Sequence, residues 1–201
     1  QLIKTNLEHE SIGVLQALAN GDPDVDAIYR LQRKLPFSFV GSNASDIFLV
    51  PKGVFVPWNA QATFFAVRES LWALYLPMTV HGRVSDIWRS YVSQRLFQSI
   101  CLRTAFAMDP LVVQERNPHS YLADFDAEQD LYYKSGKLVE LLSSWTPQAD
   151  NLMGQVLELY ILLYERDYVN IRDVQMLQLW LVELESNKYK FPVICERPNS
   201  I

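Results

Sequence analysis

The sequence predicts an α/β fold in which a mixed segment of short strands and helices is followed by a mainly helical region. Short β-branched and aromatic runs lie between proline and glycine turns at 47–50, 54–56 and 63–67, a pattern typical of strands. Apolar residues recur at helical spacing from residue 85 onward and in further stretches after residue 118. A chain of 201 residues is long enough for one core-forming domain.

In the N-terminal part, Ile12, Leu15 and Leu18 share one face of a helix, so we expect a helix over 8–20 that stops at Gly21. The turn that follows leads into the short apolar run 27–31, which could begin a strand.

The clearest predicted helix begins at Ser85, a good N-cap, with Asp86 near the positive end of the helix dipole. Pro110 follows the end of this helix. Asn170 is a candidate N-cap in the C-terminal region, where helices are predicted over 124–145, 151–165 and 170–186. We expect 1–116 to form the α/β part and 117–201 a helical region packed on it.

Composition excludes some classes of function and leaves others open. The net charge of −5 argues against nucleic-acid binding, which usually requires a basic face. No stretch approaches the roughly 20 apolar residues that cross a bilayer. Cys101 and Cys195 could form a disulfide, but Cys101 lies in an apolar helical run, which favours a buried thiol. The sequon at 43–45 is a weak indication of secretory topology.

The chain begins with Gln rather than Met, so we expect a fragment or processed product of a longer protein. The sequence contains no nucleophile elbow, zinc-protease motif, phosphate-binding loop or dinucleotide fingerprint. Hydrolase, zinc-protease and nucleotide-hydrolysis functions are therefore disfavoured.

The first candidate site is the acidic run at Asp22, Asp24 and Asp26. In an extended segment, alternating positions place these carboxylates on one side of the chain. Such oxygen ligands suit a divalent cation or sugar hydroxyls. The alternative is a solvated turn whose aspartates cap backbone amides.

The second candidate site lies around the start of the predicted helix at 85. Asp86 could accept a proton from an acceptor hydroxyl or bind a sugar hydroxyl. Arg83 and Arg89 could balance the charge of a diphosphate, and Trp88 is a further candidate for substrate contact. Alternatively, Asp86 only stabilises the helix dipole and Trp88 packs in the core.

Two weaker candidates complete the set. Lys52, Trp58, Asn59 and Gln61 follow a predicted strand and could bind a sugar through amide hydrogen bonds and an aromatic platform, although the pattern alone favours a structural turn. His119 is a weak metal-ligand candidate, since it would need carboxylates from elsewhere in the chain.

An ordered series of motifs resembles the STELLO-type glycosyltransferases over roughly residues 10–192. It consists of Gly21-Asp22-Pro23-Asp24-Val25-Asp26-Ala27, Pro51-Lys52-Gly53, Trp58-Asn59-Ala60-Gln61, Arg83-Val84-Ser85-Asp86-Ile87-Trp88-Arg89 and Asn117-Pro118-His119-Ser120-Tyr121. A more distant similarity runs to the reversibly glycosylated polypeptides, the plant UDP-arabinopyranose mutases, at Pro23–Ala27, Pro51–Gly53, Asp86–Trp88 and Asn117-Pro118.

The resemblance implies that the chain is the C-terminal part of a GT-A-like nucleotide-sugar transferase domain. Asp86 would then be catalytic, with a nucleotide sugar and a glycan or protein acceptor as substrates. A divalent metal, Mn or Mg, would be held mainly by residues upstream of Gln1. The parent would be a type II membrane protein of the Golgi lumen, with its anchor outside this chain and a Golgi protein complex as a further partner.

Two other functions stay open at this point. One is a non-catalytic Golgi scaffold or assembly factor that keeps the fold, in which Asp24 and Asp86 would be replaceable. The other is a mutase-like sugar isomerase, which only the distant similarity supports.

Overall fold

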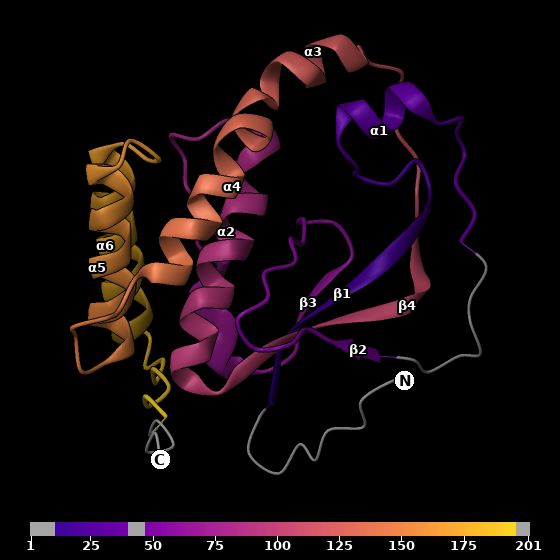
Figure 1. Cartoon of the computed structure of the whole chain (residues 1–201). Coiled ribbons are helices and arrows are strands. Elements are labelled where there is room, and N and C mark those ends of the chain that lie inside the picture. Colours follow the sequence, from indigo (N-terminus) through magenta and orange to yellow (C-terminus); the bar gives the residue numbers. More distant parts are fainter. Residues whose placement is uncertain (1–10, 40–46, 196–201) are drawn as a thin grey trace.

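A four-stranded sheet lies at the centre of the fold in the computed structural model, which describes residues 11–39 and 47–195. The long strands β1 (Ser11–Gly21) and β4 (Leu102–Gln114) run parallel side by side (Figure 1). The short strands β2 (Ile47–Leu49) and β3 (Thr63–Phe65) pair antiparallel with β4 and β1, which gives the order β2-β4-β1-β3.

The helices form layers beside this sheet. Helix α2 (Gly82–Phe97) contacts β4 and α4, while α5 and α6 pair with each other on the outer side (Figure 1). The short helices α1 and α3 contact each other at one end of the sheet. Their bounds are α1 Ala27–Gln32, α3 Tyr121–Ala127, α4 Gln129–Ser144, α5 Leu152–Glu165 and α6 Ile171–Ser186, with 3-10 helices η1 Arg68–Leu74 and η2 Gln98–Ile100.

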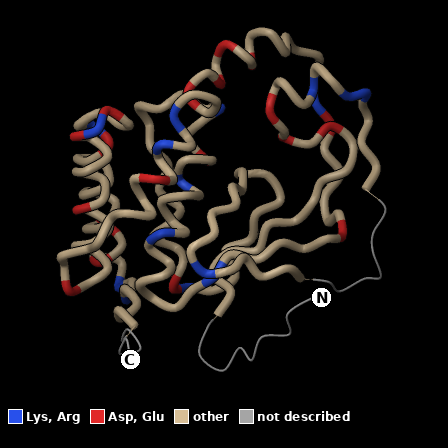
Figure 2. Tube along the Cα trace, in the orientation of Figure 1, with Lys and Arg blue, Asp and Glu red and all other residues tan. Residues whose placement is uncertain are grey.

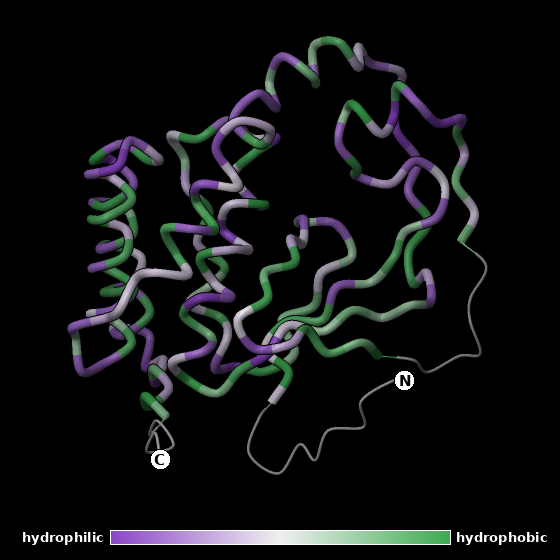
Figure 3. Tube along the Cα trace, viewed as in Figure 1, coloured by the Kyte–Doolittle hydropathy of each residue, from purple (hydrophilic) through white to green (hydrophobic). Residues whose placement is uncertain are grey.

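Aromatic residues fill the core between the sheet and α2. Trp58 stacks on Phe97 with ring centroids 6.2 Å apart, and Trp72 meets the same ring edge-on at 5.8 Å. Hydrophobic positions continue along much of β1 and β4 (Figure 3). Apolar residues of α4, α5 and α6 belong to the same cluster, so the helical region and the sheet share one core.

Several elements agree with the sequence predictions. Strands form within 47–50 and 63–67, and helices cover 151–165 and 170–186 almost to the residue. Asn170 caps α6 by accepting from the Arg172 amide at 3.2 Å. Among the described residues after β4, the regular elements are all helices, as predicted for 120–187.

The prediction of a helix over 8–20 is wrong, because residues 11–21 form β1. The strand is buried between β3 and β4, and its pairing with β4 shifts register after Ile12 and on both sides of Leu18. These irregularities reset the alternation of side chains, so the apolar residues of β1 do not follow the period of two that is typical of a strand. The expected strand at 27–31 is also wrong, since Asp26 caps the helix α1 there.

The predicted helix from Ser85 to Pro110 is wrong at both ends. Helix α2 begins at Gly82, where the side chain of His81 accepts from the Arg83 amide, and it ends at Phe97. Pro110 lies within β4, where a register shift tolerates a residue without an amide hydrogen.

Three further expectations are corrected. The run 54–56 has no strand. The helix expected over 124–145 is divided at Glu128 into α3 and α4. Cys101 is not a buried thiol, because it forms a disulfide with Cys195.

The sequon at 43–45 lies outside the described residues. Within the described ranges, no helix has the length and apolar character needed to cross a membrane.

Gly21 ends β1 and directs the chain into the acidic loop at 22–26. Its φ of +89° is left-handed, and an added Cβ would overlap the carbonyl oxygen of Gln114, which accepts the Asp22 amide at 2.8 Å. Gly53 has a similar φ of +75°, but an added Cβ would meet nothing within 4 Å.

We therefore expect Gly21→Ala to destabilise the protein more than Gly53→Ala. Both substitutions carry a left-handed penalty of about 1–2 kcal/mol, while Gly21→Ala adds about 1–3 kcal/mol for the steric overlap. Urea denaturation of both variants measures the difference in unfolding free energy. Equal losses would contradict the close approach of β1 and β4 at this turn.

Candidate functional site

A cleft of about 280 Å³ opens where four separate parts of the chain meet. One side is the loop between β1 and α1, with Asp24 and Asp26, and the other is the junction of α3 and α4, with Glu128 and Tyr132. The start of α2 and the loop at Pro57 and Asn59 complete the lining. Acidic positions lie on both the loop before α1 and the α3–α4 segment (Figure 2).

Asp86 lies in the second turn of α2 and lines this cleft with only 9% of its surface exposed. Its Oδ2 accepts from the Ala60 amide at 2.8 Å and its Oδ1 from the Ile87 amide at 2.9 Å. Burial raises the pKa of Asp86 above its ordinary value, and the charge of Asp24 adds to this, although the amide hydrogen bonds and Arg89 oppose it. The carboxylate is therefore a stronger base than an exposed aspartate.

Arg83, one turn before Asp86, ties together the acidic groups on both sides of the cleft. Its Nη1 lies 2.7 Å from Asp24 Oδ1, and its Nε donates to Glu128 Oε1 at 2.9 Å. Its Nη2 contacts Glu128 and also donates to the Val25 carbonyl at 3.3 Å. All three guanidinium nitrogens thus donate to protein oxygens, and Asp24 and Glu128 balance the charge of Arg83. The predicted role of Arg83 toward a diphosphate stays a prediction.

Asp24 also receives a second guanidinium, because Arg116 Nη2 lies 2.6 Å from its Oδ1. Burial alone raises the pKa of Asp24, but the charges and hydrogen bonds of Arg116 and Arg83 outweigh it, and the pKa falls below the ordinary value of 3.8. Asp24 therefore stays ionised, whereas Asp86 across the same cleft holds a proton more readily.

Glu128, which sequence reasoning missed, is the most buried carboxylate of the cleft, at 1% exposure. Its Oε2 accepts from the Ala27 amide at 2.7 Å and from the Tyr132 hydroxyl at 2.5 Å. The sequence carries no signal for this role, because the prediction of one helix over 124–145 leaves Glu128 as one acidic residue among several.

The loop before α1 is held by its own polar side chains. Arg30, which is buried, contacts Asp22 at 2.8 Å and donates to the Pro23 and Val25 carbonyls, so Asp22 does not line the cleft. Asp26 lines the cleft while its Oδ1 caps α1 at the Tyr29 amide, 3.0 Å away.

Asn59 and Gln61 fix the same loop from the other side. Asn59 donates to the Asp24 carbonyl at 2.8 Å, and Gln61 accepts the Asp24 amide at 2.9 Å. Of the two, Asn59 lines the cleft and Gln61 does not. The alternation of Asp24 and Asp26, together with the resemblance at Pro23–Ala27, predicts that they share one pocket with Asp86 that reaches Trp58 or Asn59. The structure places Asp24, Asp26, Asp86 and Asn59 around one cleft, as this predicts. Their chemical roles stay predictions.

Comparison with known proteins identifies the family. A family model described as STELLO glycosyltransferases matches residues 83–200, which is more than half of the chain. The chain belongs to this family. The matched range includes Asp86 and Glu128, whereas Asp24 and Asp26 precede it.

Two curated relatives from Arabidopsis thaliana extend the match to most of the chain. Probable glycosyltransferase STELLO2 is 29% identical over 182 residues, and probable glycosyltransferase STELLO1 is 28% identical over 188 residues. Each match covers 89% of this chain and 23% of the relative. The chain thus spans less than a quarter of the length of the STELLO relatives it matches.

Three of the predicted ligand-binding residues of this STELLO chain are core residues instead. Trp58 is 1% exposed and stacked on Phe97, so it cannot form a platform for a sugar. Trp88 is 3% exposed and donates its indole N–H to Ser135 Oγ at 3.0 Å. Arg89 is 5% exposed, with its guanidinium 5.8 Å from the centre of the Phe65 ring, and does not line the cleft.

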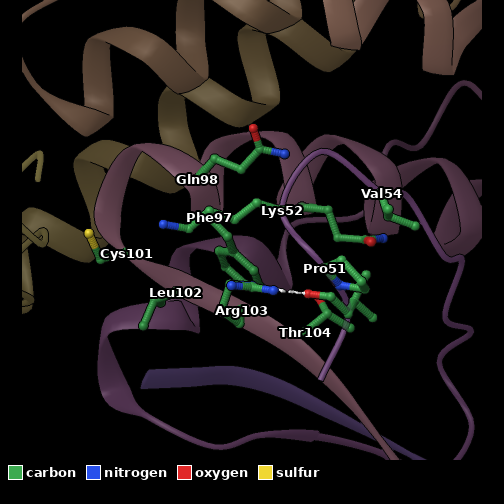
Figure 4. Close-up of a pocket in the computed structure, with 11 residues that line it drawn as sticks. Pro51, Lys52, Val54, Phe97, Gln98, Cys101, Leu102, Arg103 and Thr104 are labelled. Carbon is green, nitrogen blue, oxygen red and sulfur yellow. Dashed lines mark hydrogen bonds between the residues drawn. The ribbon is translucent and has the colours of Figure 1, made fainter. Parts of the chain in front are cut away.

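Lys52 and His119 also lie away from the cleft. Lys52 lines a separate, smaller pocket between the loop at 50–54 and the start of β4 (Figure 4). The ring nitrogens of His119 are engaged by the Asn117 carbonyl at 3.0 Å and by Asp124 Oδ2 at 2.8 Å, so neither is free to bind a metal. Nor do the described residues contain any group of three or more His, Cys, Asp or Glu that could hold a metal ion.

Tyr91 and Tyr132 provide the aromatic surface that Trp58 was expected to give. Both line the cleft, and Tyr91 packs edge-on against Phe55 with centroids 6.4 Å apart. The spacing of Ile87, Tyr91 and Val92 predicts only that Tyr91 lies on the apolar face of a helix. In the structure Tyr91 comes from the same helix as Asp86 and lines the same cleft.

We expect Glu128→Gln to lower the unfolding free energy by about 2–4 kcal/mol, because the loss of charge leaves Arg83 and the Ala27 amide without their full acceptor. Glu140→Gln, at an exposed position of α4, is the matched control and should change stability by about 0.5 kcal/mol or less. Chemical denaturation measures both. Similar values for the two variants would contradict the central position of Glu128.

The ion pairs of Asp24 predict a specific dependence of stability on pH. Because the folded-state pKa is lowered, Asp24 contributes stability that is present above its ordinary value of 3.8 and is lost as pH falls through the lower folded-state pKa. The unfolding free energy of Asp24→Asn should therefore change less with pH, below about pH 5, than that of the unsubstituted protein. Asp150→Asn, at an exposed site outside the cleft, should keep the original dependence.

Proposed function

We propose that this chain forms the acceptor side and part of the donor side of a glycosyltransferase active site, in a domain of the GT-A kind. The reaction would transfer a sugar from a nucleotide-sugar donor to a glycan or protein acceptor. The observation that carries the proposal is Asp86, a buried carboxylate with a raised pKa that faces a cleft in a chain of the STELLO glycosyltransferase family. Buried carboxylates with perturbed pKa values in clefts are typical of functional sites.

In this proposal, Asp86 acts on the acceptor hydroxyl. Its carboxylate accepts the hydroxyl proton while the hydroxyl oxygen bonds to the anomeric carbon of the donor sugar. The bond from that carbon to the nucleoside diphosphate breaks, and the diphosphate leaves with the bonding electrons. The Ala60 and Ile87 amides hold the carboxylate in one orientation, which a general base requires. The related role of binding a sugar hydroxyl uses the same geometry.

A divalent metal, Mn or Mg, would stabilise the departing diphosphate, but the described residues bring together no group of three or more His, Cys, Asp or Glu that could hold such an ion. Asp24 Oδ1 is shared by two guanidinium groups, and Glu128 is surrounded by three donors. We therefore place the metal ligands in the part of the parent protein outside this chain, and derive no step through the metal here.

We also propose that the chain works in the Golgi lumen, as part of a protein whose membrane anchor lies elsewhere. The disulfide between Cys101 and Cys195 supports an oxidising compartment, since such bonds are rare where glutathione keeps thiols reduced.

A non-catalytic scaffold is the second candidate. The observation in its favour is that Arg83, Asp24 and Glu128 satisfy one another, as residues of a purely structural network do. A scaffold would require this network but not the basicity of Asp86.

Asp86→Asn in the full-length parent distinguishes the two functions. We expect the rate of sugar transfer to fall about 100-fold or more, which is the order of a general-base contribution. The rate is measured as nucleoside diphosphate released in the presence of acceptor. The unfolding free energy should change by only about 1–2 kcal/mol, because Asn can still accept one of the two amide hydrogen bonds. In the full-length protein without the substitution, the rate of sugar transfer should rise as the pH rises through the raised pKa of Asp86.

Asp130→Asn is the matched control, since Asp130 does not line the cleft and its side chain, 46% exposed, pairs with Lys134 at 3.0 Å. It should retain transfer. If the Asp86→Asn variant keeps the transfer rate and the cellular function of the unsubstituted full-length protein, the catalytic assignment is wrong and the scaffold is favoured.

A further inference from the structure

We infer that the cleft selects uncharged sugars and rejects sugars that carry a carboxylate, sulfate or phosphate group. This inference rests on the proposed function, because it names the class of sugar that the same cleft would bind. It follows from which charges line the cleft and from how each of them is already engaged.

Negative charge dominates the cleft lining. Asp24, Asp26, Asp86 and Glu128 contribute carboxylates, whereas Arg83 is the one cation among the described lining residues. Arg116 also reaches Asp24, but it does not line the cleft. An anionic ligand would therefore enter a site whose charge repels it.

The single cation cannot compensate for this repulsion. Arg83 lies between Asp24 and Glu128 in direct contact with both, so its charge is neutralised by protein groups. Its Nε also lies 3.9 Å from Asp124. A ligand carboxylate or phosphate that reached Arg83 would therefore meet a charge already balanced by Asp24 and Glu128, and would gain little attraction to offset the repulsion from the other carboxylates.

The same lining suits neutral hydroxyls. Asp24 and Asp26 each use Oδ1 for a partner in the protein, while Oδ2 of each has no hydrogen-bond donor among the described residues. Such oxygens can accept hydrogen bonds from sugar hydroxyls. Pro57, Ile87, Leu131 and Tyr91 add apolar surface for the C–H face of a ring. The cleft thus combines acceptors with apolar contact and offers no uncommitted cation in its described lining.

The experiment uses the full-length protein and a panel of neutral oligosaccharides, each paired with a uronic-acid oligosaccharide of the same length. Saturation-transfer NMR and titration calorimetry measure binding at neutral pH and low ionic strength. We expect neutral members to bind and their uronic counterparts to bind at least tenfold more weakly. Salt should reduce this difference, because screening weakens charge repulsion.

Asp26→Asn tests whether the repulsion comes from this cleft. Asparagine is also a good N-cap, so α1 should be retained while one negative charge is removed. We expect the preference for neutral over uronic sugars to fall roughly fivefold, the order expected for one charge at close range in a partly solvated site. The exposed Asp150→Asn should leave the preference unchanged.

Two results would overturn the inference in distinguishable ways. If uronic sugars bind the unsubstituted protein as tightly as neutral ones, charge selection is wrong while the proposed function stands. If no member of either series binds, both the selection and the proposed sugar-binding function fail.

Discussion

The burial of Glu128 is the constraint on which the rest of the site depends. A buried carboxylate costs several kcal/mol unless donors surround it, and this one obtains its donors from three places. The Ala27 amide comes from the start of α1, the Arg83 guanidinium from the start of α2, and the Tyr132 hydroxyl from α4. The carboxylate is satisfied only when these three helix segments meet, and the space they enclose is the cleft. A second buried carboxylate, Asp173, fixes α6 in the same manner through the amides of Met78 and Thr79, just before α2.

This arrangement explains why cleft residues come from distant parts of the sequence and yet lie in fixed positions. Arg83 contacts both Glu128 and Asp24 and so fixes their positions relative to each other. Asn59 and Gln61 hold the backbone at Asp24 from the opposite side. The loop before α1 is therefore fixed by side chains at both of its faces. Such preorganisation is what a binding site requires, because little ordering is left for the ligand to impose.

The sequence predicted what depends on local pattern and missed what depends on long-range partners. The helix α6 follows from its apolar stripe and the Asn170 cap, and the common cleft of Asp24 and Asp86 follows from motif order and alternation. Strand β1 was mistaken for a helix because register shifts against β4, some 90 residues later, disturb its alternation. Glu128 could not be recognised, since its importance lies in the Ala27 amide and in Arg83, partners that no local pattern indicates.

The true start of α2 bears on whether Asp86 is structural or functional. The sequence allowed Asp86 to be a residue of the first turn that stabilises the helix dipole, but the helix begins at Gly82 and Asp86 lies in its second turn. The dipole effect falls off beyond the first turn, so it does not explain a carboxylate at this position. Holding the Ala60 amide does not require a charge either, because an amide oxygen would accept the same hydrogen bond. A buried charge with a raised pKa is a cost to stability that neither of these two structural roles needs, and this supports the catalytic role proposed for Asp86.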